Sequence, residues 1–438
     1  MARPTPTGAV IAALERIGVE HRDGIWIALV DPGDALAAAA EVERRMRLGD
    51  VLPLAGLTCA VKGNIDVSGL PTTAACPAFA SVPDRSAPVV RLLEAAGAVV
   101  MGVTNLDQFA TGLVGTRSPY GICPNVGWPE LISGGSSSGS AAAVAAGLVD
   151  FALGTDTAGS GRVPAAANGL VGLKPTHGRL SLTGVVPACR SLDCVSVLAR
   201  SVELASLVIE VAAASSPDPA DAWSRHEPLR AVPGDRRWRV GVPPLGTLDF
   251  DGDASGPDRF AAAVERLRSI GVDEVPVDVE PFVAAGRLLY GGAFVAERFE
   301  AVGAFVQAHL EDVDPVVGPI VVAAGELPAW ELSRDRTELE RLRRLTLPVW
   351  DRVDVVMVPS VPRLPAVAEV VAEPVAVNSM LGTYTNFVNL LDLCALALPI
   401  RGTSGDDGAA PPPSVTLIAP AWSEDVLVGL GLELTSAL

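Results

Sequence analysis

The sequence contains very little lysine. Of its 33 basic residues, only Lys62 and Lys174 are lysines, and the rest are arginines. Arginine stays protonated in proteins, whereas a desolvated lysine can lose its proton. A lysine kept against this bias is a candidate for proton chemistry, although for Lys174 alone a structural contact is the simpler interpretation.

Charged residues are also scarce, at 19% of the chain, and acidic residues outnumber basic ones. The formal net charge of −18 leaves no basic surplus to bind a phosphate backbone, so we expect no nucleic-acid partner. Hydrophobic residues make up 49% of the chain. That share is enough for a large core and excludes a chain that is disordered throughout.

Signals for secretion or membrane insertion are missing. Glu15 and Arg16 interrupt residues 1–18, which therefore do not resemble a signal peptide. The most apolar window, Ser140–Leu153, is short and contains Asp150, so it predicts a buried helix and strand rather than a membrane span. Six cysteines without a CxxC pair are typical of reduced thiols. We expect a cytoplasmic protein.

Hydrophobic periodicity predicts alternating helices and strands. The predicted helices are Val10–Gly18, Ala35–Leu48, Ala87–Ala96, Ser140–Leu148, Arg259–Ile270, Glu338–Val353 and one long or two abutting helices in Val283–His309. The predicted strands are Leu57–Val61, Ala98–Val103, Asp150–Gly154, Gly169–Leu173, Arg239–Val242, Glu274–Val277 and Val355–Val358. This alternation predicts an α/β/α sandwich around a large mixed, mostly parallel sheet. Without an internal repeat, we expect a single domain over residues 1–438.

Two loops of small residues carry the candidate nucleophiles. Residues 134–140 read GGSSSGS and precede an alanine-rich helix, where glycines permit tight geometry and backbone N–H groups favour negative charge. Residues 154–162 read GTDTAGSGR. Small residues before Ser160 let consecutive N–H groups point to one spot, as an oxyanion needs. Upstream, residues 61–64 read VKGN and place Lys62 at the end of a predicted strand.

These three segments resemble the amidase signature family, whose hallmark is a lysine, a GGSS-type loop and a GGS-type nucleophile in this order and at this spacing. The resemblance implies that Ser160 is the nucleophile, that Ser136 relays protons and follows a cis peptide bond, and that Lys62 is the base. It implies an oxyanion hole made by the backbone N–H groups of Thr157, Ala158, Gly159 and Ser160. No metal and no cofactor are implied.

This chemistry requires Lys62 to be neutral at rest. The pKa of lysine must fall from about 10.4 to about 7, which corresponds to about 4 kcal/mol. Burial without a carboxylate partner supplies such a change. Asp66 is near enough in sequence to pair with Lys62, but a strand end followed by Gly63 does not place the two side chains on one face. We therefore expect Asp66 to point elsewhere.

Further segments resemble the family members that hydrolyse allophanate, the carboxylate of urea, with release of ammonia. They are residues 57–66 (LTCAVKGNID), 104–112 (TNLDQFATG), 187–194 (PACRSLDC) and 382–389 (GTYTNFVN). In those members a Tyr and an Arg eight residues apart on one helix bind the substrate, and Tyr290 and Arg298 have this spacing. A guanidinium suits a planar carboxylate. The resemblance also implies a backbone contact from Gly115.

Two departures from those members stand out. Where they commonly carry Pro-Trp, this chain has Ala293-Phe294, which predicts a different pocket wall. The chain ends at Leu438, just after the amidase region, so we expect no C-terminal accessory domain of the kind that processes the carboxylated product in longer relatives. The alternative substrate is another small amide or a dicarboxylic half-amide. Dimers are common among relatives, so a homodimer is an expectation.

Three other interpretations compete with this one. Residues 135–139 fit a G-x-S-x-G nucleophile elbow around Ser137, which needs a preceding strand and a late histidine, yet no histidine follows His309. The four histidines (His21, His177, His226 and His309) are isolated, which disfavours a zinc hydrolase. A non-enzymatic binding module would have no reason to keep a neutralisable lysine with two matched serine loops.

Overall fold

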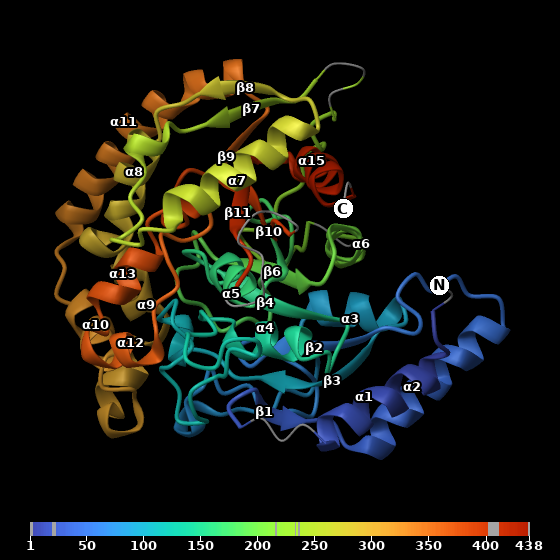
Figure 1. The fold of residues 1–438 in the computed structure, drawn as a ribbon. Helices are drawn as coiled ribbons and strands as arrows, with labels where there is room; N and C mark the ends of the chain where they lie inside the picture. The colour runs from blue at the N-terminus through green and yellow to red at the C-terminus, as the bar shows by residue number, and fades with distance from the viewer. Residues whose placement is uncertain are drawn as a thin grey trace.

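The structure is a computed structural model that describes residues 3–19, 23–214, 217–232, 234, 237–401 and 411–436. Within these residues, one 11-stranded sheet runs through the molecule in the order β1-β3-β2-β4-β6-β5-β10-β11-β9-β7-β8 (Figure 1). The strands are β1 (Trp26–Leu29), β2 (Thr58–Lys62), β3 (Val99–Thr104), β4 (Phe151–Asp156), β5 (Val171–Lys174), β6 (Cys194–Ala199), β7 (Arg239–Val242), β8 (Asp273–Pro276), β9 (Val355–Pro359), β10 (Leu393–Pro399) and β11 (Ser414–Pro420).

Helices cover both faces of this sheet. They are α1 (Pro6–Val19), α2 (Pro32–Arg47), α3 (Pro88–Ala95), α4 (Ser138–Ala145), α5 (Arg162–Ala167), α6 (Val202–Ala212), α7 (Gly256–Ser269), α8 (Glu280–Gly291), α9 (Ala296–Ala308), α10 (Val317–Ala324), α11 (Ala329–Arg352), α12 (Val367–Ala372), α13 (Ala376–Leu381), α14 (Asn386–Leu390) and α15 (Glu424–Ser436). Helices α3, α6, α7 and α15 pack on one face. Helices α1, α2 and α4, and further along α8, α11 and α14, pack on the other.

Alternation along the strands confirms the sandwich. In β10, Cys394 and Leu396 belong to the core under α15, whereas Leu393 and Ala395 belong to the core under α8 and α14. Successive side chains of a strand point to opposite faces, so both faces of the sheet are buried. The predicted α/β/α arrangement around a large mixed sheet is therefore confirmed.

The expectation that the sheet is mostly parallel is wrong. Among the described strands, six of the ten neighbouring pairs are antiparallel. Every antiparallel pair contains β1, β6, β10 or β11, which the periodicity did not identify as strands. The parallel pairs join only strands that the sequence predicted. Strands that alternate with helices in the sequence indicate parallel neighbours joined by crossover connections. This pattern does not reveal antiparallel strands that are inserted between them in the sheet.

The other local predictions agree with the structure within a few residues. The region predicted as one long or two abutting helices is two, α8 and α9, because the chain is extended at Gly292 and then makes a 3-10 turn at Ala293–Val295. All six cysteines are free thiols and buried, as expected. Among the described helices, none is both long and apolar enough to cross a bilayer.

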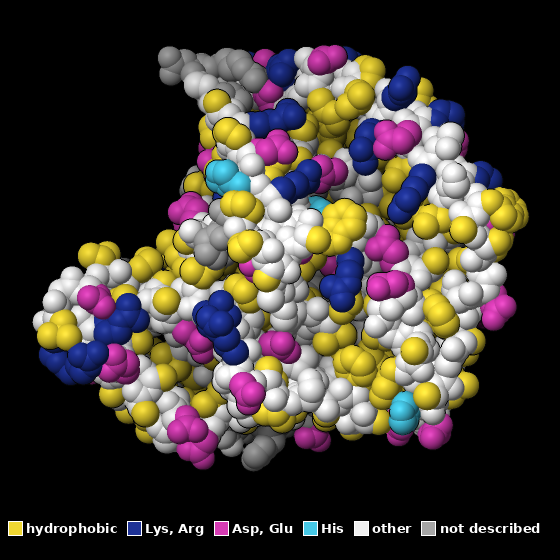
Figure 2. All heavy atoms as spheres, turned by 180° about the vertical axis from the view of Figure 1, so that it is seen from behind, with side chains coloured by type: hydrophobic (Ala, Val, Ile, Leu, Met, Phe, Trp, Pro, Cys, Tyr) yellow, Lys and Arg dark blue, Asp and Glu magenta, His cyan; other side chains and the backbone are white. Residues whose placement is uncertain are grey.

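The surface mixes charges of both signs. Basic and acidic side chains lie interspersed over the face drawn in Figure 2. On α11, Arg341 lies 2.7 Å from Glu338.

Parallel strands β2 and β4 position the candidate site. They are neighbours in register, with Val61 opposite Leu153, so their carboxyl ends reach the same edge of the sheet. Helix α4 begins beside these ends, and its Ala141, Ala142 and Ala143 are fully buried. These small side chains allow a close approach of helix and sheet, which brings the loop before α4 next to the strand ends.

Candidate active site

Lys62 is the last residue of β2 and is fully buried. Its Nζ lies 2.8 Å from Ser136 Oγ and 2.7 Å from Thr155 Oγ1. Among the described residues, no carboxylate oxygen lies within ion-pair distance of this amine; Asp66 instead accepts a hydrogen bond from Thr72, as expected of a residue that points elsewhere. Burial lowers the pKa of Lys62 to about 7, against the opposing fields of Asp107, Asp193 and Asp156.

The two serine loops meet beside this amine. The peptide bond between Gly135 and Ser136 is cis. The Ser137 amide donates to the Ser160 carbonyl at 3.4 Å, which places the chain at 136–137 next to the candidate nucleophile. The structure contains no hydrogen bond between the Ser136 and Ser160 hydroxyls in the part of the chain it describes. Such contacts are often long before a substrate binds.

A buried ion pair holds the loop of Ser160. Arg162 donates Nε and Nη2 to the two carboxylate oxygens of Asp156, each at 2.9 Å, and neither side chain is exposed. Asp156 also accepts the amides of Gly159 and Gly161. This pairing lowers the pKa of Asp156 in spite of burial, which on its own would raise it. One carboxylate thus fixes the turn on both sides of Ser160.

Removing one partner of this pair is expected to destabilise the protein strongly. In Asp156→Asn, the Arg162 charge stays buried without a counterion, and such losses cost about 3–5 kcal/mol. The denaturant midpoint of unfolding should fall clearly below that of the unsubstituted protein. Glu338→Gln removes an exposed pair on α11 and should leave the midpoint unchanged. Equal midpoints for both variants would contradict a structural role for the buried pair.

The predicted oxyanion donors are not all free. The Gly159 amide donates to Asp156 Oδ1 at 2.9 Å, so the structure uses this group inside the loop. In the described chain, the amides of Thr157, Ala158 and Ser160 have no protein acceptor. The Thr157 side chain is anchored by Asp193 at 2.5 Å. Three N–H groups rather than four are therefore available to a developing oxyanion.

The backbone amide and carbonyl of Gly115 both have hydrogen-bond partners within the protein. Its amide donates to Asp107 Oδ2, and its carbonyl accepts the Cys123 amide, both at 3.0 Å. The Asp107 carboxylate also accepts the amides of Val114 and Arg117. Gly115 has a φ of +76°, and a Cβ there would lie 2.5 Å from Ser133 Oγ. The requirement for glycine is therefore explained by the positive φ and by the close packing of this position against Ser133.

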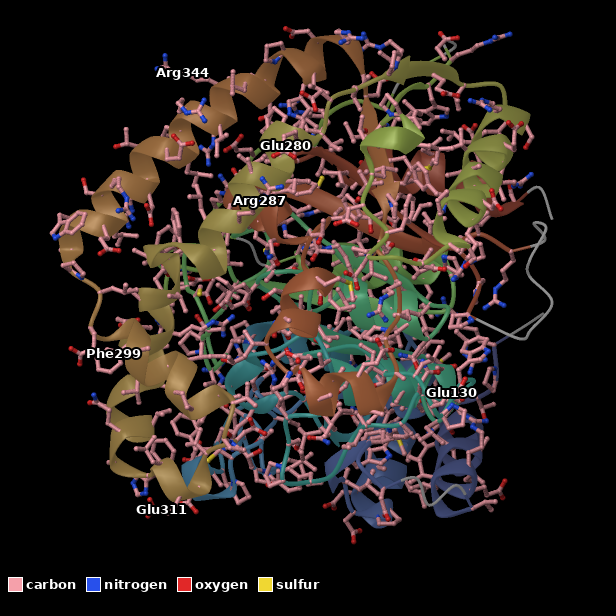
Figure 3. The ribbon with its side chains drawn as sticks, turned by 60° about the vertical axis from the view of Figure 1, so that its left-hand side comes forward. Glu130, Glu280, Arg287, Phe299, Glu311 and Arg344 are labelled. Carbon is pink, nitrogen blue, oxygen red and sulfur yellow. The ribbon has the colours of Figure 1, made fainter. Side chains whose placement is uncertain are left out.

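Tyr290 and Arg298 meet, although they do not share a helix. Tyr290 is on α8 and Arg298 on α9, so of the two predicted alternatives the chain adopts two abutting helices, and the pair does not share one helix as in the family members that the segment resembles. In Figure 3, α8 carries the labelled Glu280 and Arg287, and α9 carries the labelled Phe299. Arg298 Nη2 nevertheless donates to the Tyr290 hydroxyl at 2.9 Å. The break between the helices replaces the expected helical geometry and still brings both side chains together.

Ala293-Phe294 lies in the 3-10 turn between α8 and α9, and both residues are buried. The Ala293 amide donates to Asp335 Oδ2 at 2.7 Å. A proline has no N–H and could not make this bond. The departure noted in the sequence is therefore accompanied by a contact to α11 that a proline would exclude.

A pocket of about 500 Å³ adjoins Tyr290. Thr111 and Gly112 line one side, and Ile320 and Ala323 of α10 line another. Thr111 Oγ1 also accepts from Arg298 Nη1 at 2.8 Å. The pocket lining, within the described chain, includes neither Lys62 nor the two serines, and of the Tyr290–Arg298 pair it includes only Tyr290.

The competing interpretations lose support. The Ser137 hydroxyl donates to the Thr155 carbonyl and accepts the Thr155 amide, so it is occupied by strand β4. His177, His226 and His309 lie at three separate places, against Arg190, Trp422 and Asp312 respectively. His21 is outside the described residues. Neither a Ser–His elbow at Ser137 nor a zinc site is formed by the histidines that the structure describes.

Sequence reasoning missed several residues of this centre. Thr155, the Asp156–Arg162 pair and Thr111 all fall inside segments that the resemblance covered, but none of them was assigned a role from the sequence. A charged or hydroxyl side chain inside an otherwise small-residue loop was the available signal. Its partner could not be inferred, since the contacts join segments far apart in the sequence.

The Amidase family matches residues 9–428. The chain therefore belongs to the amidase family, and it is an enzyme that acts on C–N bonds. It is 44% identical to urea amidolyase of Saccharomyces cerevisiae over 427 residues, which are 95% of this chain and 22% of that protein. This chain thus spans about a fifth of the length of that relative.

Two further relatives agree with this assignment. The solved structure of allophanate hydrolase from Kluyveromyces lactis superposes with a TM-score of 0.91 and 40% identity, covering 99% of this chain and 70% of that one. Urea amidolyase of Lachancea kluyveri is 45% identical over 414 residues, which are 93% of this chain and 22% of that protein. The resemblance found in the sequence, to the amidase signature family and to allophanate hydrolase, is confirmed.

Proposed function

We propose that this protein hydrolyses allophanate and releases ammonia, with Ser160 as nucleophile, Ser136 as proton relay and Lys62 as base. The likeness to urea amidolyase and to allophanate hydrolase supports the substrate. The short contact between Lys62 and Ser136 supports the base and relay. The runner-up is an amidase for another small amide or a dicarboxylic half-amide.

The surroundings of Arg298 are the main structural support for an anionic substrate. Its guanidinium is buried, and in the described chain no carboxylate lies within ion-pair distance. Its Nη1 is used by Ala110 and Thr111, but Nε has no partner there. A buried charge without a counterion is costly. The edge formed by Nε and Nη2, next to the Tyr290 hydroxyl, matches the two oxygens of a planar carboxylate.

The first half of the proposed reaction forms an acyl-enzyme. Neutral Lys62 takes the proton of Ser136, and Ser136 takes that of Ser160 as its Oγ attacks the amide carbonyl carbon. The developing oxyanion is stabilised by the amides of Thr157, Ala158 and Ser160. The relay then returns a proton to the nitrogen, the C–N bond breaks, and ammonia leaves.

The second half returns the enzyme to its starting state. Water attacks the acyl group on Ser160, and the same relay removes a proton from this water. The Ser160 oxygen leaves with a proton from the relay, which restores its hydroxyl. Throughout, Arg298 and Tyr290 hold the carboxylate end of the substrate, so only an anionic amide of this length places its carbonyl at Ser160.

A comparison of substrates tests this proposal. The purified protein is offered allophanate, malonamate, biuret and a simple neutral amide, and ammonia release is measured. We expect the largest kcat/KM with allophanate, because it has both the planar carboxylate and the short spacing to the amide. Faster turnover of a neutral amide than of allophanate would overturn the substrate and leave the triad in place.

Replacing Arg298 is expected to change specificity more than chemistry. Arg298→Met should lower kcat/KM for allophanate by about 100-fold, since charged hydrogen bonds contribute about 1.5–3 kcal/mol each. Turnover of a neutral amide should change little at alkaline pH, where Lys62 is neutral with or without the nearby guanidinium. Arg298→Lys keeps the charge without the bidentate edge and should recover only part of the loss. Equal losses for both substrates would show that Arg298 does not select the carboxylate.

The proposed setting is the cytoplasm, where free thiols such as the six buried cysteines are stable. A homodimer stays a prediction. Sedimentation of the purified protein tests it directly.

A further inference from the structure

Thr155 is a second hydroxyl neighbour of the amine of the proposed base, beside the relay serine. It is on β4, is 2% exposed, and its Oγ1 lies 2.7 Å from Lys62 Nζ. Lys62 therefore has two hydroxyl neighbours, Thr155 and Ser136, at nearly equal distances. Nothing in the proposed cycle assigns a role to Thr155.

The two neighbours must have opposite hydrogen-bond roles when Lys62 is neutral. A neutral amine has two N–H donors and a single lone pair. To act as a base, Lys62 must point its lone pair at the Ser136 proton. The Thr155 oxygen then has to accept an N–H from Lys62. If Thr155 donated its proton instead, it would occupy the lone pair and turn an N–H toward Ser136, which blocks the relay.

Asn64 favours the productive arrangement. Its Nδ2 lies 3.3 Å from the Val186 carbonyl and 3.4 Å from Thr155 Oγ1. A carbonyl oxygen only accepts, so the atom facing Val186 is the amide nitrogen. The second hydrogen of this same nitrogen is directed to Thr155. The Thr155 oxygen thus receives donors from Asn64 and from Lys62, which leaves both its lone pairs in use.

We propose that Thr155 is a positioning residue of the reaction: by accepting an N–H from Lys62, its hydroxyl oxygen turns the lone pair of Lys62 toward Ser136. This inference rests on the proposed triad but not on the identity of the substrate. Thr155 acts through Lys62 and does not touch the reacting atoms. It also stabilises the ammonium form that exists while the proton is held by Lys62, since that form needs acceptors.

The test uses a fluorophosphonate reagent, which reads out Ser160 without any choice of amide. The Ser160 oxygen forms a bond to phosphorus, the P–F bond breaks, fluoride leaves, and the serine proton passes to Lys62 through Ser136. The rate of labelling is measured by mass spectrometry between pH 5 and about 9. The series consists of the unsubstituted protein and Thr155→Ser, Thr155→Cys and Thr155→Val.

Labelling should follow the acceptor strength of the side chain at position 155. Thr155→Ser should stay close to the unsubstituted rate, while Thr155→Val, of equal size and without an acceptor, should be about 10- to 100-fold slower. In Thr155→Val, the fall of the labelling rate on the acid side of the pH profile (the acid limb) should also move to lower pH, because the ammonium form of Lys62 loses a hydrogen bond. Thr155→Cys keeps a weak acceptor, should fall between the two, and gives the same direction if the valine variant does not fold.

Two results would overturn the inference. One is an unchanged rate and acid limb in Thr155→Val; the other is a Thr155→Ser protein as slow as Thr155→Val, which would indicate a packing role. Absence of label on Ser160 in the unsubstituted protein would instead reject the proposed triad itself. The failure of the inference and the failure of the proposed function are therefore separate outcomes.

Discussion

Ser160→Ala is expected to lower kcat/KM by about 10⁴- to 10⁶-fold while the protein stays folded. The reason is that the acyl-enzyme cannot form without the Ser160 oxygen, and the binding groups and oxyanion donors alone give only a small residual rate. Ammonia release measures the loss. Thermal unfolding of the same sample checks that the fold is retained. We expect it to be retained, because the substitution removes a single hydroxyl from a residue that is 2% exposed.

The comparison variant for this prediction is Ser137→Ala. Ser137 Oγ holds the backbone of Thr155, so its loss should reduce stability and leave covalent labelling at Ser160. A Ser137→Ala protein that is inactive and unlabelled, beside a Ser160→Ala protein that retains more than about 1% of activity, would move the nucleophile to Ser137.

Lys62→Met and Lys62→Arg are both expected to lower kcat/KM by about 10²- to 10⁴-fold, the usual contribution of general-base catalysis. Methionine removes the amine, whereas arginine keeps a positive charge that it cannot lose. Equal losses therefore identify proton transfer as the function. An arginine variant that kept most of the activity would show that Lys62 acts only through its charge.

The pH dependence of the unsubstituted protein follows from the same group. Burial lowers the pKa of Lys62 to about 7, so the amine is neutral and active above this value and protonated below it. On the acid side, kcat/KM should fall tenfold for each pH unit below about 7. The Lys62 variants should lack this acid limb. A limb that persists in Lys62→Met would belong to another group.

The sequence predicted strands β2, β3, β4, β5, β7, β8 and β9, and it missed β1, β6, β10 and β11. It did not predict β10, which reads LCALALP and consists mainly of alanine and leucine. These residues favour helices when considered alone. Strand β10 forms because β5 and β11 pair with it on either side, which is a tertiary effect that periodicity does not report.

The site was predictable to the extent that it depends on order and spacing along the chain. Lys62 and Ser136 lie in contact as expected. Their separation of 74 residues along the chain does not by itself indicate that they are close in space. The sequence did not predict that the amides of Gly159 and Gly115 donate to the carboxylates of Asp156 and Asp107. These hydrogen bonds depend on the folded conformation of the two loops. The position of Tyr290 and Arg298 on two helices depends on the break at Gly292.

The scarcity of lysine makes the central claim directly measurable. The chain has only Lys62 and Lys174, so a protein labelled isotopically at the lysine ε-carbon should give two lysine signals in its NMR spectrum, and Lys62→Arg identifies which is which. We expect the Lys62 signal to titrate with a pKa of about 7. If it titrates only near the ordinary lysine value of about 10.4, the amine is charged at neutral pH and cannot be the base.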